Sequence, residues 1–99
     1  GAVTQVTSRT TGVTLDKPCG AITLFSAAGS VTPASFVVTN AKVSALDTVN
    51  ISQKSGTNDY VACVSRVAAG SFTVTFYTTG GTATDAPVFN FAVVKAVIS

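Results

Sequence analysis

The stretch Ser71–Thr78, with the sequence SFTVTFYT, alternates apolar and polar side chains one residue at a time. Phe72, Val74 and Phe76 share one face of an extended chain, whereas the residues between them place hydroxyl groups on the other. A period of two is typical of a β-strand with one buried face. The stretch therefore predicts a strand of an antiparallel sheet, with one face on a core and the other in water.

Similar runs fill the rest of the chain, and none has the spacing of a long amphipathic helix. Groups of Gly, Asn, Ser and Pro separate them, as expected where the backbone reverses tightly. The pattern predicts about eight short strands, near residues 2–8, 12–15, 20–25, 34–40, 47–53, 59–68, 71–78 and 86–98. No sequence is left for the crossover helices of a parallel sheet. We expect one all-β domain over residues 1–99, an antiparallel β-sandwich, with the jelly roll as the specific form considered.

The composition combines a small charged fraction with a large apolar one. The 99 residues are 46% hydrophobic and only 10% charged, against about 25% charged in a typical soluble domain. Thr and Val make up about a third of the chain, and both suit pleated strands. Hydroxyl, amide and small apolar groups must therefore cover most of the surface. We expect part of that surface to be hidden in an oligomer or on a large assembly.

The six basic residues are scattered along the chain: Arg9, Lys17, Lys42, Lys54, Arg66 and Lys95. A nucleic-acid-binding protein usually carries a basic stripe, and the sequence shows none. We interpret the net charge of +2 as isolated, solvated surface charges and expect no nucleic-acid partner.

The sequence contains few of the residue types that enzymes use for catalysis. The chain has no His, and each acidic residue lies beside a turn or a strand boundary: Asp16, Asp47, Asp59 and Asp85. His is the usual acid–base group and metal ligand near neutral pH. No phosphate loop or nucleophile elbow is present, and so few carboxylates disfavour a paired-carboxylate glycosidase. We expect no catalytic residue, cofactor or metal site, and hence a binding or structural protein rather than an enzyme.

The two cysteines, Cys19 and Cys63, leave two alternatives open. A disulfide between them would close a long loop and stabilise the fold by roughly 4 kcal/mol. However, Cys63 lies among apolar residues in the middle of a predicted strand, where a free thiol behaves as a small hydrophobic side chain. We favour buried, unpaired thiols.

The last predicted strand, residues 86–98, is the longest apolar run, but it contains Asn90 and Lys95. It is shorter than the roughly 20 residues that span a bilayer, and residues 1–9 lack the pattern of a secretory leader, so we expect no membrane insertion. The strand is apolar on both faces, and a sandwich this small offers few ways to cover the second face. We therefore predict self-association through that face, with these interface residues: Val88, Ala92, Val94, Ala96 and Ile98.

Two tyrosines, Tyr60 and Tyr77, are candidate surface contacts for a sugar or a protein. A tyrosine ring is apolar with one polar end, which suits such contacts. The alternative is that both rings pack at the rim of the core with their hydroxyls in water.

Three runs of the sequence resemble a small β-domain found in virion proteins of tailed bacteriophages and in prophages. They are TTGVTLDKPCGAITL at residues 10–24, SRVAAGSF at 65–72 and APVFNFAVVKA at 86–96. The resemblance implies a structural or host-contacting phage component that forms a trimer and carries no catalytic motif.

We therefore expect a non-enzymatic virion protein that is assembled in the host cytoplasm. The preferred function is capsid decoration, as a cement or head-fibre protein that contacts the capsid or other virion proteins. The alternative is a tail-fibre tip that binds a host glycan or surface receptor. A reducing cytoplasm agrees with unpaired thiols.

Overall fold

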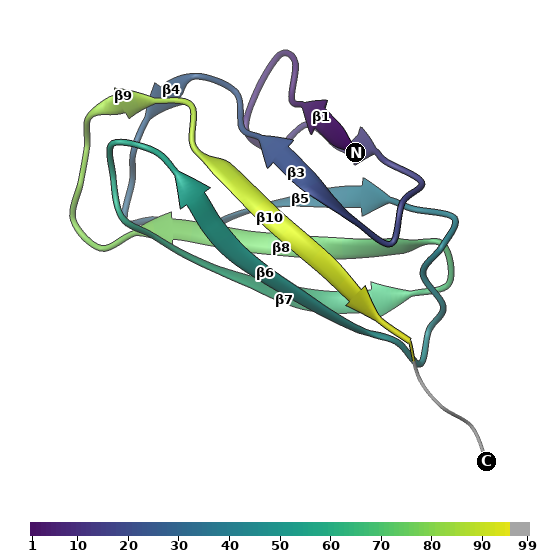
Figure 1. Cartoon of the computed structure of the whole chain (residues 1–99). Helices are drawn as coiled ribbons and strands as arrows, with labels where there is room; N and C mark the ends of the chain where they lie inside the picture. Colours follow the sequence, from purple (N-terminus) through teal and green to yellow (C-terminus); the bar gives the residue numbers. More distant parts are fainter. Residues whose placement is uncertain (96–99) are drawn as a thin grey trace.

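Two β-sheets face each other across one core in the computed structural model, which describes residues 1–95 (Figure 1). Sheet A consists, in spatial order, of β1 (Ala2–Thr4), β3 (Cys19–Thr23), β10 (Val88–Val94) and β6 (Thr48–Ser55). Sheet B consists of β2 (Val13–Thr14), β5 (Ala34–Thr39), β8 (Ser71–Thr78) and β7 (Tyr60–Ala68). A small ribbon at one end pairs β4 (Ala27–Ala28) with β9 (Thr84–Asp85). The all-β sandwich is thus confirmed, while the jelly roll stays a prediction.

Strand pairing departs from the expectation at two edges. The long strands pair antiparallel, but β1 runs parallel to β3 and β2 runs parallel to β5. The antiparallel direction expected for these two short strands was wrong, because an alternating pattern reports which side chains face the core and not which strand lies alongside. β4 and β9 were missed because two residues are too few for an alternation. Within residues 1–95, no helix is long and apolar enough to cross a membrane.

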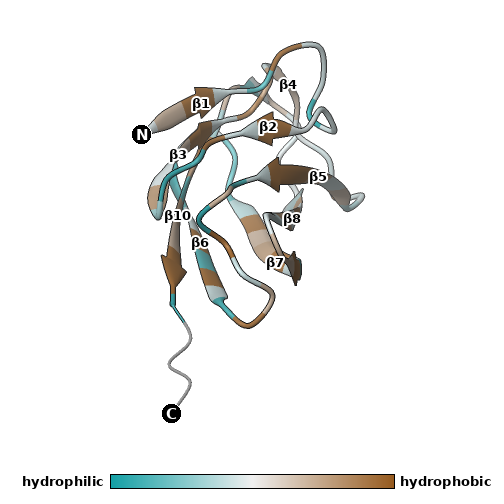
Figure 2. Ribbon diagram, turned by 90° about the vertical axis from the view of Figure 1, so that its right-hand side faces the viewer, coloured by the Kyte–Doolittle hydropathy of each residue, from teal (hydrophilic) through white to brown (hydrophobic). Residues whose placement is uncertain are grey.

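Aromatic rings connect the two sheets. Phe72 of β8 packs against Phe91 of β10 with ring centroids 5.2 Å apart, and Phe76 lies 6.1 Å from Phe89. Tilted and edge-on pairs of this kind are favoured by the ring quadrupoles. The inward face predicted for Ser71–Thr78 is confirmed. Hydropathy alternates along the long strands, as the bands on β6 and β7 show in Figure 2. The buried apolar residues come mostly from alternate strand positions: Val13, Ile22, Leu24, Phe36, Val38, Val43, Val49, Phe72, Val74, Phe76, Phe89 and Phe91.

A bulge in β7 changes the predicted faces of that strand. The pairing with β8 shifts register just after Val64. Val67 thereby packs against the core together with Ala62 and Val64. The alternation had placed Val67 on the other face with Val61 and Cys63, which was wrong because one inserted residue reverses every following side chain.

The outward side of β10 is mostly apolar, as predicted, with Asn90 as its polar member, and nothing within residues 1–95 covers most of it. Val88 is half-buried, Ala92 is exposed, and Val94 is 50% exposed. Ala96 and Ile98, the other two predicted interface residues, lie outside the described residues. The inward side of the same strand belongs to the core.

The Phe91 ring, only 3% exposed, should be a major contributor to stability. Replacing it in Phe91→Ala removes a packed ring and leaves a cavity, so the free energy of unfolding should fall by about 3–5 kcal/mol in a denaturant titration. Its neighbour Asn90 points outward and is exposed, so Asn90→Ala should change that free energy by less than about 0.5 kcal/mol. A loss below about 1 kcal/mol for Phe91→Ala would contradict its place in the core.

Candidate functional site

A cluster of polar side chains closes the end of the sandwich where β4 and β9 lie; we define it as Arg9, Asn58, Tyr60 and Asp85. Asp85 is its centre, and only 4% of the Asp85 side chain is exposed. Its carboxylate accepts hydrogen bonds from the backbone N–H groups of Thr57 (2.9 Å) and Asn58 (3.0 Å). The Tyr60 hydroxyl (2.7 Å) and the Arg9 guanidinium (3.0 Å) also donate to it. The carboxylate is therefore buried but fully partnered.

Arg9 connects this carboxylate to two other segments of the chain, residues 25–27 and the start of β7. Its Nε donates to the carbonyl of Phe25 (2.8 Å), and its Nη2 donates to the carbonyl of Ala27 (2.7 Å). Its Nη1 donates to the Tyr60 hydroxyl at 2.7 Å, and the guanidinium carbon lies 5.6 Å from the Tyr60 ring centroid. Only 10% of the Arg9 side chain is exposed. The interpretation of Arg9 as a solvated surface charge was wrong, because its partners come from distant parts of the chain.

The cluster shifts two pKa values in opposite directions. Burial alone would raise the pKa of Asp85, but hydrogen bonds from Asn58, Tyr60, Arg9 and Thr57 stabilise the carboxylate more, so its pKa lies below the usual 3.8. Burial and the hydrogen bond to Asp85 raise the pKa of Tyr60 above 10.0. At neutral pH the cluster thus holds an ionised Asp85 and a protonated Tyr60.

The polar side chains of this cluster are engaged in hydrogen bonds within the protein. Within residues 1–95, every buried side-chain nitrogen or oxygen has a partner. Both Asp85 oxygens accept bonds from the protein. No three potential metal-ligating side chains gather anywhere in this described part. What the cluster does is hold residues 5–11, β4, β9 and the turn before β7 together.

The ten charged residues leave both broad faces of the sandwich almost neutral. Most of the charges lie in the connecting loops at the two ends; at one end, for example, Lys95 Nζ contacts the Asp47 carboxylate at 2.5 Å. Of the described residues in sheets A and B, only Lys54 and Arg66 are charged. The broad faces are therefore suited to contacts that exclude water without burying charge.

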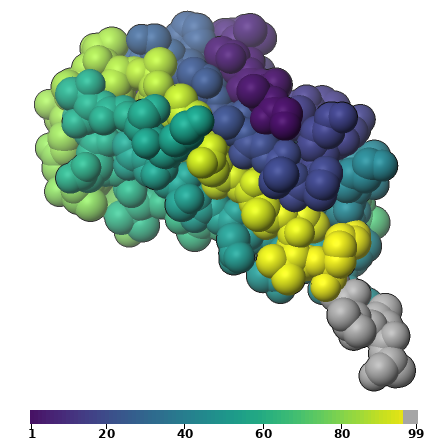
Figure 3. Space-filling model, viewed as in Figure 1, coloured from purple at the N-terminus to yellow at the C-terminus, as the bar shows by residue number. Residues whose placement is uncertain are grey.

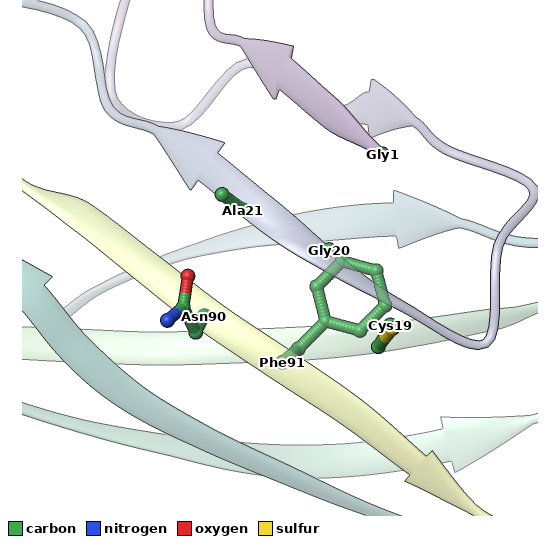
Figure 4. Close-up of a pocket in the computed structure, with 6 residues that line it drawn as sticks. All are labelled: Gly1, Cys19, Gly20, Ala21, Asn90 and Phe91. Carbon is green, nitrogen blue, oxygen red and sulfur yellow. The ribbon is translucent and has the colours of Figure 1, made fainter.

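Face A is the outer surface of sheet A, turned toward the viewer in Figure 3. Two shallow hollows flank Asn90 on this face. The larger, of about 320 Å³, lies between β3 and β10 (Figure 4) and is lined by Gly1, Cys19, Gly20, Ala21, Asn90 and Phe91. Three of the predicted interface residues lie on this face, whose outward positions are Ala2, Thr4, Cys19, Ala21, Thr23, Thr48, Asn50, Ser52, Lys54, Val88, Asn90, Ala92 and Val94.

Face B is the outer surface of sheet B, on the opposite side of the core. Hydroxyl groups of Ser35, Thr75 and Ser65 form a hydrogen-bonded row across three strands, with distances of 2.9 and 3.0 Å. Two exposed valines flank the row, Val37 at 45% and Val61 at 39% exposure. The face thus combines hydroxyl groups with exposed apolar side chains.

The structure separates the two predicted tyrosine contacts. Tyr77 lies on face B, where it is paired with Val61 of the neighbouring strand. Tyr60 lies on the inner side: its ring is 5.7 Å from that of Phe89, and its hydroxyl donates to Asp85. Only Tyr77 is placed to contact a partner.

Both cysteines are free, as predicted, but both are exposed, and the prediction that they are buried was wrong. Cys19 is on face A and Cys63 on face B, because each occupies an outward position of its strand. A disulfide needs Cα atoms within about 7 Å. Packed sheets lie about 10 Å apart, and these two thiols point away from each other. The fold therefore excludes an intrachain disulfide.

The buried cluster was missed at the level of sequence. Arg9 bonds to residues 51 and 76 positions away in the chain, and nothing in its local sequence distinguishes it from the other cations. Asp85 was recognised only as a residue beside a turn. Its hydrogen bonds to Thr57 and Asn58 depend on the tertiary fold.

Removing the Asp85 charge should destabilise the protein in a pH-dependent way. In Asp85→Asn, Arg9 loses its buried counter-ion, so we expect a loss of about 3–5 kcal/mol at pH 7. Because the folded pKa of Asp85 is depressed, its contribution is complete above the unfolded pKa of 3.8 and is lost as the pH falls through the folded value. In denaturant titrations, the difference in free energy of unfolding between the wild type and Asp85→Asn should become smaller below about pH 4. Asp59, which is exposed, provides the control. Asp59→Asn should change the free energy of unfolding little, both at pH 7 and below about pH 4.

Both thiols should react in the native protein without reductant. At a protein concentration low enough to keep the chain monomeric, a thiol-blocking reagent should add two labels by intact mass, and Cys63→Ser should reduce this to one, because each thiol is exposed on its own face of the single chain. Labelling only after denaturation would show instead that the thiols are buried.

Comparison with known proteins adds no relative: no protein-family model, curated protein or solved structure matches this chain.

Proposed function

We propose that this chain is a non-enzymatic structural protein of a tailed-phage virion, and that it decorates the capsid. The observation that carries the proposal is the near-neutrality of both broad faces in a protein whose charges lie mostly at its ends. Exposed apolar area on a soluble domain usually marks a protein contact. The resemblance of residues 10–24, 65–72 and 86–96 to phage virion domains supports the choice of a virion.

The two faces take different partners in this proposal. Face A, with Val88, Ala92 and Val94, mediates self-association, in three copies if the family resemblance holds. Face B contacts the shell through its exposed valines and its row of hydroxyls. Because the faces lie on opposite sides of the core, one molecule contacts both partners at once.

Binding to undecorated capsids tests the proposal. Because face B carries few charges, affinity should change little between low and high salt. Val37→Lys puts a charge in the middle of face B and should weaken binding at least about tenfold. The matched control is Leu46→Lys, which changes an equally apolar side chain, 66% exposed, in a loop away from both faces. Failure of the protein to bind capsids at all would contradict the proposal.

Thiol labelling identifies the contacting face. On decorated capsids, Cys63 of face B should be protected from a thiol reagent, and a Cys19→Ser variant shows this protection without interference. Cys63 that stays fully reactive on saturated particles would exclude face B as the contact with the shell.

A second candidate function is a tail-fibre tip that binds a host glycan. The observation in its favour is Tyr77 on face B, next to the hydroxyl row, since aromatic rings and hydroxyls are the groups that contact sugars. Retention on host cells or on a glycan array, lost in Tyr77→Ala and accompanied by no capsid binding, would favour this function.

A further inference from the structure

Residues 1–15 form an arm at the edges of both sheets, distinct from the body of the sandwich, residues 16–95 (Figure 2). β1 pairs in parallel with the edge of β3, and β2 pairs in parallel with the edge of β5. These two strands have only three and two residues, and parallel pairs are slightly less stable per residue than antiparallel ones. Of the side chains of the arm, only Gln5 and Val13 are buried. The arm therefore contributes little of the apolar core.

The body keeps its own pairing without the arm. Sheet A then retains β3, β10 and β6, and sheet B retains β5, β8 and β7, all paired antiparallel. Within the described residues, the paired aromatic rings all belong to the body, including Phe72 with Phe91 and Phe76 with Phe89. The contacts that join the two sheets thus do not include the arm. Contiguous segments of this kind are the units that open separately in native proteins.

Arg9 provides the main polar attachment of the arm to the body. Its guanidinium donates to the carbonyls of Phe25 and Ala27. It also donates to the Tyr60 hydroxyl and to the Asp85 carboxylate. All four partners lie in the body, and only 10% of the Arg9 side chain is exposed. Because a buried charge is costly without its counter-ion, Arg9 leaves Asp85 only when it reaches water, which requires the arm around it to move.

The segment between Gln5 and Arg9 carries backbone strain. Thr7 has a φ of 77°, which is unfavourable for a β-branched residue. Such a conformation persists only where the surroundings enforce it. Here the supports are Arg9 on one side and Gln5 on the other, whose side chain accepts from the N–H of Phe25 (3.0 Å). Opening of the arm relieves this strain and so costs less free energy than opening of an unstrained arm.

We propose that the arm opens from the body as one unit while the two sheets stay folded, and that Arg9 is the latch that holds it closed. Opening uncovers the edges of β3 and β5. Unpaired N–H and C=O groups at a sheet edge can pair with another extended segment. The latch therefore controls access to these two edges. The proposal depends neither on capsid decoration nor on self-association.

Hydrogen exchange of the native chain, followed by NMR, measures this opening. Three amides bridge the arm and the body: Gln5 N–H donates to the Thr23 carbonyl, Leu15 N–H to that of Thr39, and Ala21 N–H to that of Gly1. They should exchange with one common opening constant, at least about tenfold larger than that of the amides of β8. Exchange of these bridging amides at the rate of the β8 amides would mean that the arm opens only by global unfolding, against the proposal.

A core variant separates local from global opening. Val74 of β8 is 0% exposed, so Val74→Ala should destabilise the body and speed exchange of the β8 amides at least about tenfold. The bridging amides should keep their rate, because opening of the arm leaves β8 folded. If Val74→Ala speeds the bridging amides by the same factor, the arm is not a separate unit and the proposal is overturned.

A pair of arginine variants tests the latch. Arg9→Gln should speed exchange of the bridging amides at least about tenfold. The matched control is Arg66→Gln, which changes an exposed arginine of β7 and should leave their rate unchanged. Bridging amides that exchange equally in Arg9→Gln and the wild type would exclude Arg9 as the latch. Circular dichroism should show each variant folded, and the comparison of the wild type with Val74→Ala decides the opening of the arm without Arg9→Gln.

Discussion

The packing of phenylalanine rings between the sheets is the interaction on which the rest of the structure depends. Phe72 and Phe76 project from β8, and they meet Phe89 and Phe91 from β10. Both strands have hydrogen-bonded neighbours on either side, so this contact sets the position of one sheet relative to the other. Apolar burial is worth roughly 25 cal/mol per Å², and in a chain with so few charges it is the principal stabilising term. The same alternation that sends the rings inward sends their neighbours outward and so creates faces A and B.

Where the apolar core ends, polar groups are buried, and within residues 1–95 every buried side-chain nitrogen or oxygen has a partner. At one end, Arg9 and Asp85 form an ion pair in which each side chain makes further hydrogen bonds. At the other, Lys95 pairs with Asp47, whose side chain is only 1% exposed. Buried charges are tolerated when paired in this way and are costly when a partner is lost.

The distribution of charge connects the fold to the proposed function. With the charges mostly in the end loops, the two faces present hydroxyl, amide and small apolar groups. Contacts made by such faces depend on shape and apolar burial and respond little to salt. The faces also differ from each other: face A has the exposed apolar side of β10 and two shallow hollows, whereas face B has a hydroxyl row between Val37 and Val61. This difference is the reason for assigning self-association to one face and the shell to the other.

The sequence by itself determined the all-β class, the existence of every long strand and the inward residues of β8, because alternation is a local property of an extended chain. It also identified the apolar outer side of β10. Only the tertiary structure decided that β1 and β2 pair in parallel, that a bulge turns Val67 inward, that Arg9 is buried and that Cys63 is exposed. Each of these depends on which distant segment lies alongside. The side chains of one segment specify their own directions but not the neighbour they meet.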